Sequence, residues 1–89
     1  MQFSWDTKKA TRNAAKHGIE FGEAVTAFAD PVAIVVQDSA HHDRLVLIGQ
    51  SSKERLLLVV YAEFDEDVVR IISARRPTAH ERRRYEEGT

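Results

Sequence analysis

Basic and amide side chains recur along one side of the segment 7–17. They are Lys9, Arg12, Asn13 and Lys16. In a helix, at about 100° per residue, these positions fall within a sector of about 100°. A stripe of this kind suits the phosphate backbone of a nucleic acid. The alternative interpretation is an ordinary solvated helix face, because charged side chains are mostly exposed.

A histidine closes the same segment, followed directly by a glycine. His17 is a candidate for proton transfer, because histidine titrates close to neutral pH. The negative end of a helix dipole would favour its charged form. The alternative is a histidine that only bonds the last carbonyls of the helix, with Gly18 as the left-handed cap.

Arginine interrupts an otherwise apolar strand-like run at 68–74. Strict alternation would place Val68, Arg70, Ile72 and Ala74 on one face, and Val69, Ile71, Ser73 and Arg75 on the other. An unpaired buried guanidinium is costly, so Arg70 either lies in a concave site or pairs with a carboxylate. Guanidinium groups clamp phosphate and stabilise charge that develops on it, which makes Arg70 and Arg75 candidate catalytic residues.

A charged segment follows Pro77, and its spacing predicts a final helix. Thr78 and Glu81 have the spacing of a capping box, which would engage Glu81. His80 and Arg84 share a face and could join an anion site, as could the neighbouring Arg76. Tyr85 could act as an acid or a stacking platform, or simply pack in the core.

Neither a metal nor a cofactor is expected. The chain contains no cysteine, and its four glycines are scattered rather than gathered in a phosphate-binding loop. The run His41-His42-Asp43 is not a convincing metal site, because three adjacent residues in a turn cannot all face one ion. We therefore expect a site without metal ligands.

Length and charge limit the class of protein. The chain has 89 residues and 43% apolar residues, which predicts one domain spanning 1–89 with one real core. No apolar run approaches the ~20 residues of a membrane span, and the N-terminus does not read as a signal peptide, so we expect a cytoplasmic protein with no membrane partner.

The net charge is −1, yet residues 1–17 and 70–89 each carry +3 while 18–69 carry −7. Ends that meet in the fold would form one basic cleft for a polyanion.

The periodicity supplies the elements that would position these residues. A strand is expected at 3–5, helices at 7–17 and 21–28, strands at 32–37, 44–49, 56–61 and 68–74, and a helix from 78 to about 88. The loops between the four later strands are short, which favours antiparallel hairpins. The fold class is therefore α+β: an N-terminal strand and two helices packed on an antiparallel meander, with a C-terminal helix.

Two signatures resemble those of BrnT-type toxins. The opening one is Phe3-x-Trp5-Asp6-x-x-Lys9-x-x-x-Asn13-x-x-Lys16-His17-Gly18-Ile19-x-Phe21-x-x-Ala24, then Phe28-x-Asp30-Pro31. The closing one is Arg70-Ile71-Ile72-Ser73-Ala74-Arg75-Arg76, followed by Glu81 and Tyr85. The resemblance covers essentially the whole chain. One departure is Asp43-Arg44, which follows a histidine pair in a shorter loop than is usual in the family.

The resemblance implies a RelE-like fold and metal-independent cleavage of RNA. It also implies a BrnA-type antitoxin as partner, through which alone the protein would reach operator DNA. We expect the catalytic residues to be Arg70, Arg75, His17, Lys9, Glu81 and Tyr85, and the RNA-binding residues to be Arg12, Asn13, Lys16, Arg76, His80 and Arg84. In this scheme Arg70 and Arg75 stabilise charge, while His17 is the first candidate for proton transfer, ahead of Glu81, His80 and Tyr85. The alternatives are a non-catalytic module that binds nucleic acid or an acidic helix, and a structural partner of a DNA-binding protein.

Overall fold

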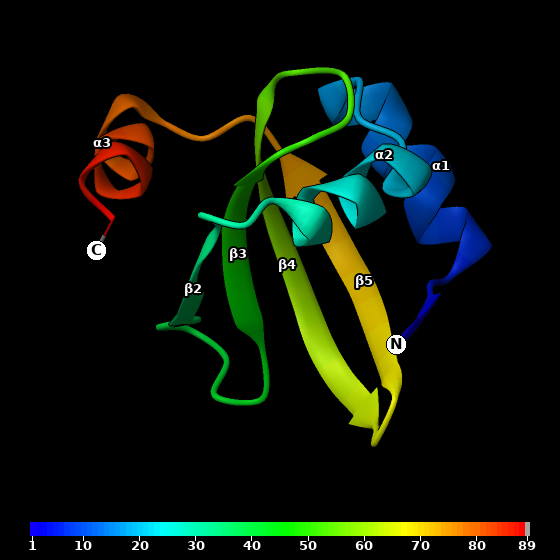
Figure 1. The fold of residues 1–89 in the computed structure, drawn as a ribbon. Coiled ribbons are helices and arrows are strands. Elements are labelled where there is room, and N and C mark those ends of the chain that lie inside the picture. The colour runs from blue at the N-terminus through cyan, green and yellow to red at the C-terminus, as the bar shows by residue number, and fades with distance from the viewer. Residues whose placement is uncertain (89) are drawn as a thin grey trace.

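Helices and strands follow one another along the chain in the predicted order (Figure 1). The computed structural model describes residues 1–88; Thr89, the last residue of the predicted domain, lies outside the described residues. The elements are β1 (Gln2–Ser4), α1 (Thr7–His17), α2 (Phe21–Thr26), the 3₁₀ turn η1 (Ala27–Ala29), β2 (Ile34–Gln37), β3 (Leu45–Gln50), β4 (Leu56–Asp65), β5 (Val68–Arg75) and α3 (Ala79–Glu87). The predicted α+β class with a C-terminal helix is confirmed.

The five strands form one sheet in the order β1-β5-β4-β3-β2. Strands β2 to β5 make the predicted antiparallel meander. Strand β1 instead joins the outer side of β5 in parallel, pairing Gln2–Ser4 with residues 68–70. The sequence predicts this strand but not its partner, because the pairing spans most of the chain. Strand β1 does not cover the edge of β5 beyond Arg70, and this part of the edge lies beside α1.

Helices α1 and α2 lie on the same face of the sheet, which we call the helical face (Figure 1). Asp6 caps α1 by accepting hydrogen bonds from the backbone N–H groups of Lys8 and Lys9. Gly18 ends the helix at a φ of 70°. The main core lies between the helices and the sheet. Its largest fully buried members are Ile19, Phe21, Leu57, Val59 and Ile71.

The second face of the sheet is only partly covered, and we call it the open face. Helix α3 lies on this side and packs against β3 (Figure 1). A smaller core of Ile48, Leu56 and Leu58 lies there, with Tyr85 of α3 packed against it. The predicted capping box is present: the Thr78 hydroxyl accepts from the Glu81 N–H, and the Glu81 carboxylate accepts from the Thr78 N–H.

A β-bulge in β5 overturns the predicted alternation of faces. Tyr61 pairs with Ile71, but Val60 pairs with Ser73, so Ile72 is an extra residue without a partner on β4. Beyond Ile72 the two faces exchange. Ala74 joins Val69 and Ile71 in the main core, whereas Arg70, Ser73 and Arg75 share the open face.

Candidate functional site

A groove lies between α1 and the uncovered edge of β5, and we call it the α1–β5 groove. It encloses about 230 Å³ and is lined by Lys9, Arg12, Asn13, Lys16, His17, Ile72 and Ser73. Lys9, Arg12 and Lys16 are exposed, and His17 is half-buried. No carboxylate is among the lining residues, so the groove carries three positive charges without a counterion in its wall. The predicted basic stripe is therefore assembled as one surface, with the bulged residue Ile72 in its floor.

Asn13 forms the buried link between this helix and the sheet. Its side-chain nitrogen donates to the carbonyl oxygens of Ile19 at 3.0 Å and Ala74 at 2.9 Å, and its oxygen accepts from the Ala74 N–H at 3.0 Å. The amide thus pairs with the free edge of β5 as a neighbouring strand would. Because both amide hydrogens are engaged, the geometry gives Asn13 a positioning role rather than the predicted contact to RNA.

A second recess, the open-face hollow, lies on the open face of the sheet. It encloses about 390 Å³. Its apolar floor comes from β3 and β4, and its rim from β2, the loop after β2, the end of β5 and α3. The lining residues are Val36, Gln37, Asp38, Ser39, Val46, Ile48, Leu58, Val60, Arg75, Glu81 and Arg84. The structure places α1 beside β5, as the charge pattern predicts. The basic residues are nevertheless divided between two recesses, because Arg75 lines the hollow while Lys9, Arg12 and Lys16 line the groove.

Arg75 and Glu81 form a bidentate ion pair at the rim of the hollow. The Arg75 Nη1 and Nη2 donate to the Glu81 Oε1 at 2.8 Å and Oε2 at 2.9 Å, and Nη1 also donates to the Arg76 carbonyl. Three of the five guanidinium N–H donors are thus used. The Arg75 pairing, with the Thr78 N–H bond, lowers the pKa of Glu81 to about 2. A carboxylate this acidic is a poor proton acceptor near neutral pH.

Tyr85 is held by Asp30, which follows η1. The Tyr85 hydroxyl donates to the Asp30 Oδ2 at 2.6 Å, and the same oxygen accepts from the Gln50 N–H. The bond to the carboxylate raises the pKa of Tyr85 to about 12. This phenol therefore favours the role of an anchor for α3 over that of an acid or a stacking platform.

Arg70 does not have the carboxylate partner that a structural ion pair would require. Within residues 1–88 it makes no ion pair, and its guanidinium lies 5.9 Å from the centre of the Phe64 ring. Phe64 is 69% exposed. Arg70 and Lys9 also help to lower the pKa of Asp6, whose carboxylate is mainly stabilised by backbone N–H groups. Of the remaining predicted RNA contacts, Arg76 is exposed before α3, His80 is exposed in the first turn of α3, and Arg84 lines the hollow.

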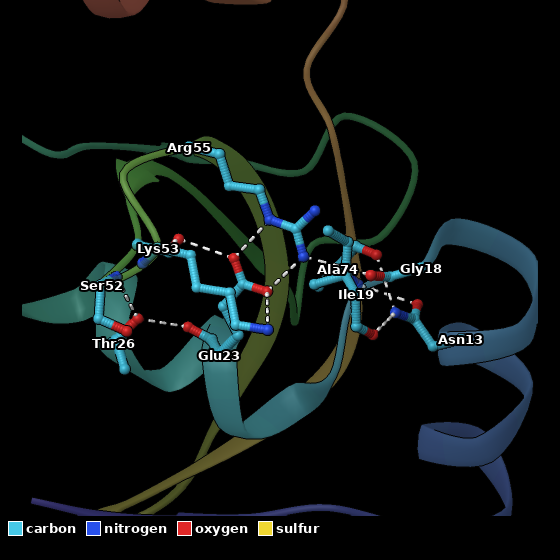
Figure 2. Close-up of polar contacts among 10 residues, drawn as sticks. Asn13, Gly18, Ile19, Glu23, Thr26, Ser52, Lys53, Arg55 and Ala74 are labelled. Carbon is cyan, nitrogen blue, oxygen red and sulfur yellow. Dashed lines mark hydrogen bonds and ion pairs between the residues drawn. The ribbon is translucent and has the colours of Figure 1, made fainter.

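The sequence did not single out the ion pair that braces the turn between α1 and α2 (Figure 2). The Glu23 carboxylate accepts from the Arg55 Nε and Nη2 and from the Ser51 hydroxyl, and Arg55 also donates to the Gly18 carbonyl at 3.2 Å. The Glu23 side chain is 3% exposed. The Arg55 bonds lower its pKa to about 2, against the effect of burial. This cluster fixes the end of α1 that carries His17.

The donor set of the described residues offers no metal centre. Within residues 1–88, no three histidine or carboxylate side chains gather closely enough to hold a metal ion. His41, His42 and Asp43 lie exposed in the β2–β3 loop. No helix in the same part of the chain is long and apolar enough to cross a membrane.

Comparison with known proteins identifies the family of the chain. The profile of the family described as ribonuclease toxin, BrnT, of type II toxin–antitoxin systems matches residues 5–81. The protein belongs to the BrnT family. A similar solved structure is the crystal structure of the Brucella abortus ribonuclease toxin BrnT. It has 28% sequence identity and a TM-score of 0.72 over 88% of this chain and 97% of that chain. No curated protein sequence matches the chain.

Membership of the BrnT family assigns the chain to the toxin side of a type II toxin–antitoxin system. The family description therefore implies an RNA target and an antitoxin partner. The matched range includes the whole α1–β5 groove and the Arg75–Glu81 pair. Arg84 and Tyr85 lie beyond it, on the second half of α3.

Proposed function

We propose that this BrnT-family protein is a metal-independent endoribonuclease that binds its RNA along the α1–β5 groove. The observation that carries the proposal is the lining of the groove: Lys9, Arg12 and Lys16 converge on one surface without a carboxylate among them. Phosphate contacts from such cations supply affinity that does not depend on sequence. The growth-inhibiting action would follow from loss of cellular RNA in the cytoplasm.

The chemistry proposed is transesterification. The RNA 2′-oxygen attacks the adjacent phosphorus, the bond to the 5′-oxygen breaks, and a 2′,3′-cyclic phosphate remains. One proton leaves the 2′-hydroxyl and one reaches the 5′-oxygen, so a side chain that can accept and donate a proton is needed. His17, on the groove wall, is the side chain best suited to this, since Glu81 and Tyr85 are committed to other bonds.

Arg75 is proposed to stabilise the charge that develops on the phosphate. Two of its five donors have no acceptor within the described residues, so the guanidinium can contact a phosphate without leaving Glu81. It lies two residues beyond Ser73 of the groove, a separation of about 7 Å along a strand. An RNA chain that lies in the groove can therefore reach Arg75 where it crosses the end of β5.

The proposed partner is a BrnA-type antitoxin, which would bring the complex to operator DNA. A short neighbouring reading frame that encodes a DNA-binding protein of this type would support the assignment.

The experiment is a cleavage assay with purified protein and single-stranded RNA in excess EDTA. We expect new ends carrying cyclic phosphate, and a loss of activity of at least tenfold in the K9A/K16A variant. Lys8→Ala is the matched control, because Lys8 is exposed on the same helix but outside the groove. Intact RNA at every protein concentration would favour the non-catalytic binding module instead. Equal activity of K8A and K9A/K16A would remove the groove from the mechanism.

A further inference from the structure

The floor of the open-face hollow is an apolar surface that α3 leaves uncovered. Ile48 and Leu58 are buried in the smaller core, but Val46 and Val60 beside them are only half-buried. The apolar surface continues along the open face of β4 through Ala62, which pairs with Arg70. Exposure of such a surface to water is unfavourable in proportion to its apolar area. A hollow of this kind is typical of a binding site rather than of ordinary protein surface.

The charges of the hollow differ in kind from those of the α1–β5 groove. Two cations, Arg75 and Arg84, share its rim with two carboxylates, Asp38 and Glu81. The formal charge of the lining is therefore zero, whereas that of the groove is positive. A neutral rim gives a polyanion no net attraction beyond the local contact to Arg75. A protein segment, in contrast, can place an apolar side chain on the floor and polar groups at both walls.

We propose that the open-face hollow is the docking site for the cognate antitoxin, which inserts one or more apolar side chains onto Val46 and Val60. This inference rests on the proposed function only in its consequence for activity. A partner bound in the hollow would cover the two donors of Arg75 that are left for a phosphate. The volume of about 390 Å³ is within the range, about 300–1,000 Å³, of sites that bury small ligands. The family supplies the occupant, because a type II toxin has a protein antitoxin as partner.

The test measures binding directly, by calorimetry between purified toxin variants and the purified cognate antitoxin. We expect V46A/V60A to weaken the complex at least tenfold, while RNA cleavage by the free variant stays within about twofold of wild type. Val35→Ala is the matched control: Val35 is 50% exposed on β2 and outside the hollow. Its affinity should be unchanged. Thermal unfolding verifies that each variant is folded.

A second variant separates loss of the apolar contact from loss of the fold. Val60→Thr keeps nearly the same shape and places a hydroxyl on the floor, so it should also weaken the complex with little effect on stability. Unchanged affinity of both variants would overturn the proposal, as would an equal loss of affinity in K9A/K16A, which would place the antitoxin on the groove. A loss of RNA binding in V46A/V60A would assign the hollow to RNA. If no variant and no wild-type protein cleaves RNA, the proposed function fails while the calorimetry still decides this inference.

Discussion

Glu23 is buried although its neighbours in the sequence give it the pattern of a surface residue. Charged residues in an amphipathic helix are usually exposed, and its partner Arg55 lies 32 residues further along the chain. Nothing local in the sequence indicates that the two will meet. The short loop 50–55 between two expected strands places Ser51 and Arg55 beside the carboxylate. Sequence analysis therefore found the side chains that line the groove but not the ion pair that supports them.

The Glu23–Arg55 pair makes the free energy of unfolding depend on pH. The pKa of Glu23 falls from 4.5 to about 2 on folding, so its contribution is fully present above pH 4.5 and is lost as the pH falls toward 2. A shift of this size corresponds to about 3 kcal/mol. We expect Glu23→Gln to lower the free energy of unfolding at pH 7 by about that amount, because it leaves Arg55 unpaired. Urea unfolding at pH 7 and pH 3 should show a smaller pH dependence in E23Q. Glu20→Gln, at an exposed neighbour, is the control, and equal behaviour of the two variants would contradict the assignment.

Substitution of Glu81 tests whether a side chain of α3 takes part in proton transfer. Its carboxylate is held by Arg75 and by the Thr78 N–H, and its pKa is about 2. We therefore expect Glu81→Gln to keep RNA cleavage within about fivefold and to cost about 1 kcal/mol of stability, since a cap and an ion pair are weakened. Both quantities can be measured on the same preparation. A loss of a hundredfold or more in cleavage rate, with the pH–rate profile losing its acid limb, would instead make Glu81 the catalytic base.

At the scale of elements, periodicity located every helix and strand but could not place the bulge. Helix α1 has the predicted bounds, and β4 runs four residues further than expected because its end is paired with β5. Strict alternation separates Arg70 from Arg75, whereas the extra residue Ile72 returns them to one face. A bulge depends on the partner strand as much as on its own sequence, so it carries no reliable local signal.

The end of α1 depends on one backbone angle. Gly18 has a φ of 70° and Gly22, inside α2, does not have a positive φ, while neither has an atom within 4 Å of an added Cβ. The two positions therefore differ in backbone conformation and not in space. We expect Gly18→Ala to destabilise the protein by about 1 kcal/mol and Gly22→Ala to be neutral or stabilising. Thermal unfolding of the pair measures this difference, and equal stabilities would show that the αL cap is not what ends the helix.

The whole molecule joins distant parts of the chain through β5. This strand pairs with β1, contacts α1 and leads directly into α3, so the basic N-terminal and C-terminal segments both reach it. The charge pattern of the sequence predicted that meeting. It could not predict that the strand would separate the charges into a basic groove and a neutral hollow, because that division depends on which sheet face each side chain occupies.

This division makes RNA binding depend on local rather than total charge. The protein has a net charge of −1, which by itself would not attract a polyanion, so affinity must come from local cations, chiefly the three of the groove. Release of counterions from single-stranded nucleic acid gives a slope of log affinity against log salt of about −0.7 per phosphate contact, hence about −2 for three contacts. We expect Lys9→Ala or Lys16→Ala to reduce the steepness by about 0.7, and Lys8→Ala to leave it unchanged. Fluorescence anisotropy with a short RNA between 50 and 300 mM salt, roughly the range over which such slopes are resolved, provides the measurement. A flat salt dependence, or an equal change in all three variants, would mean that the groove does not bind the backbone.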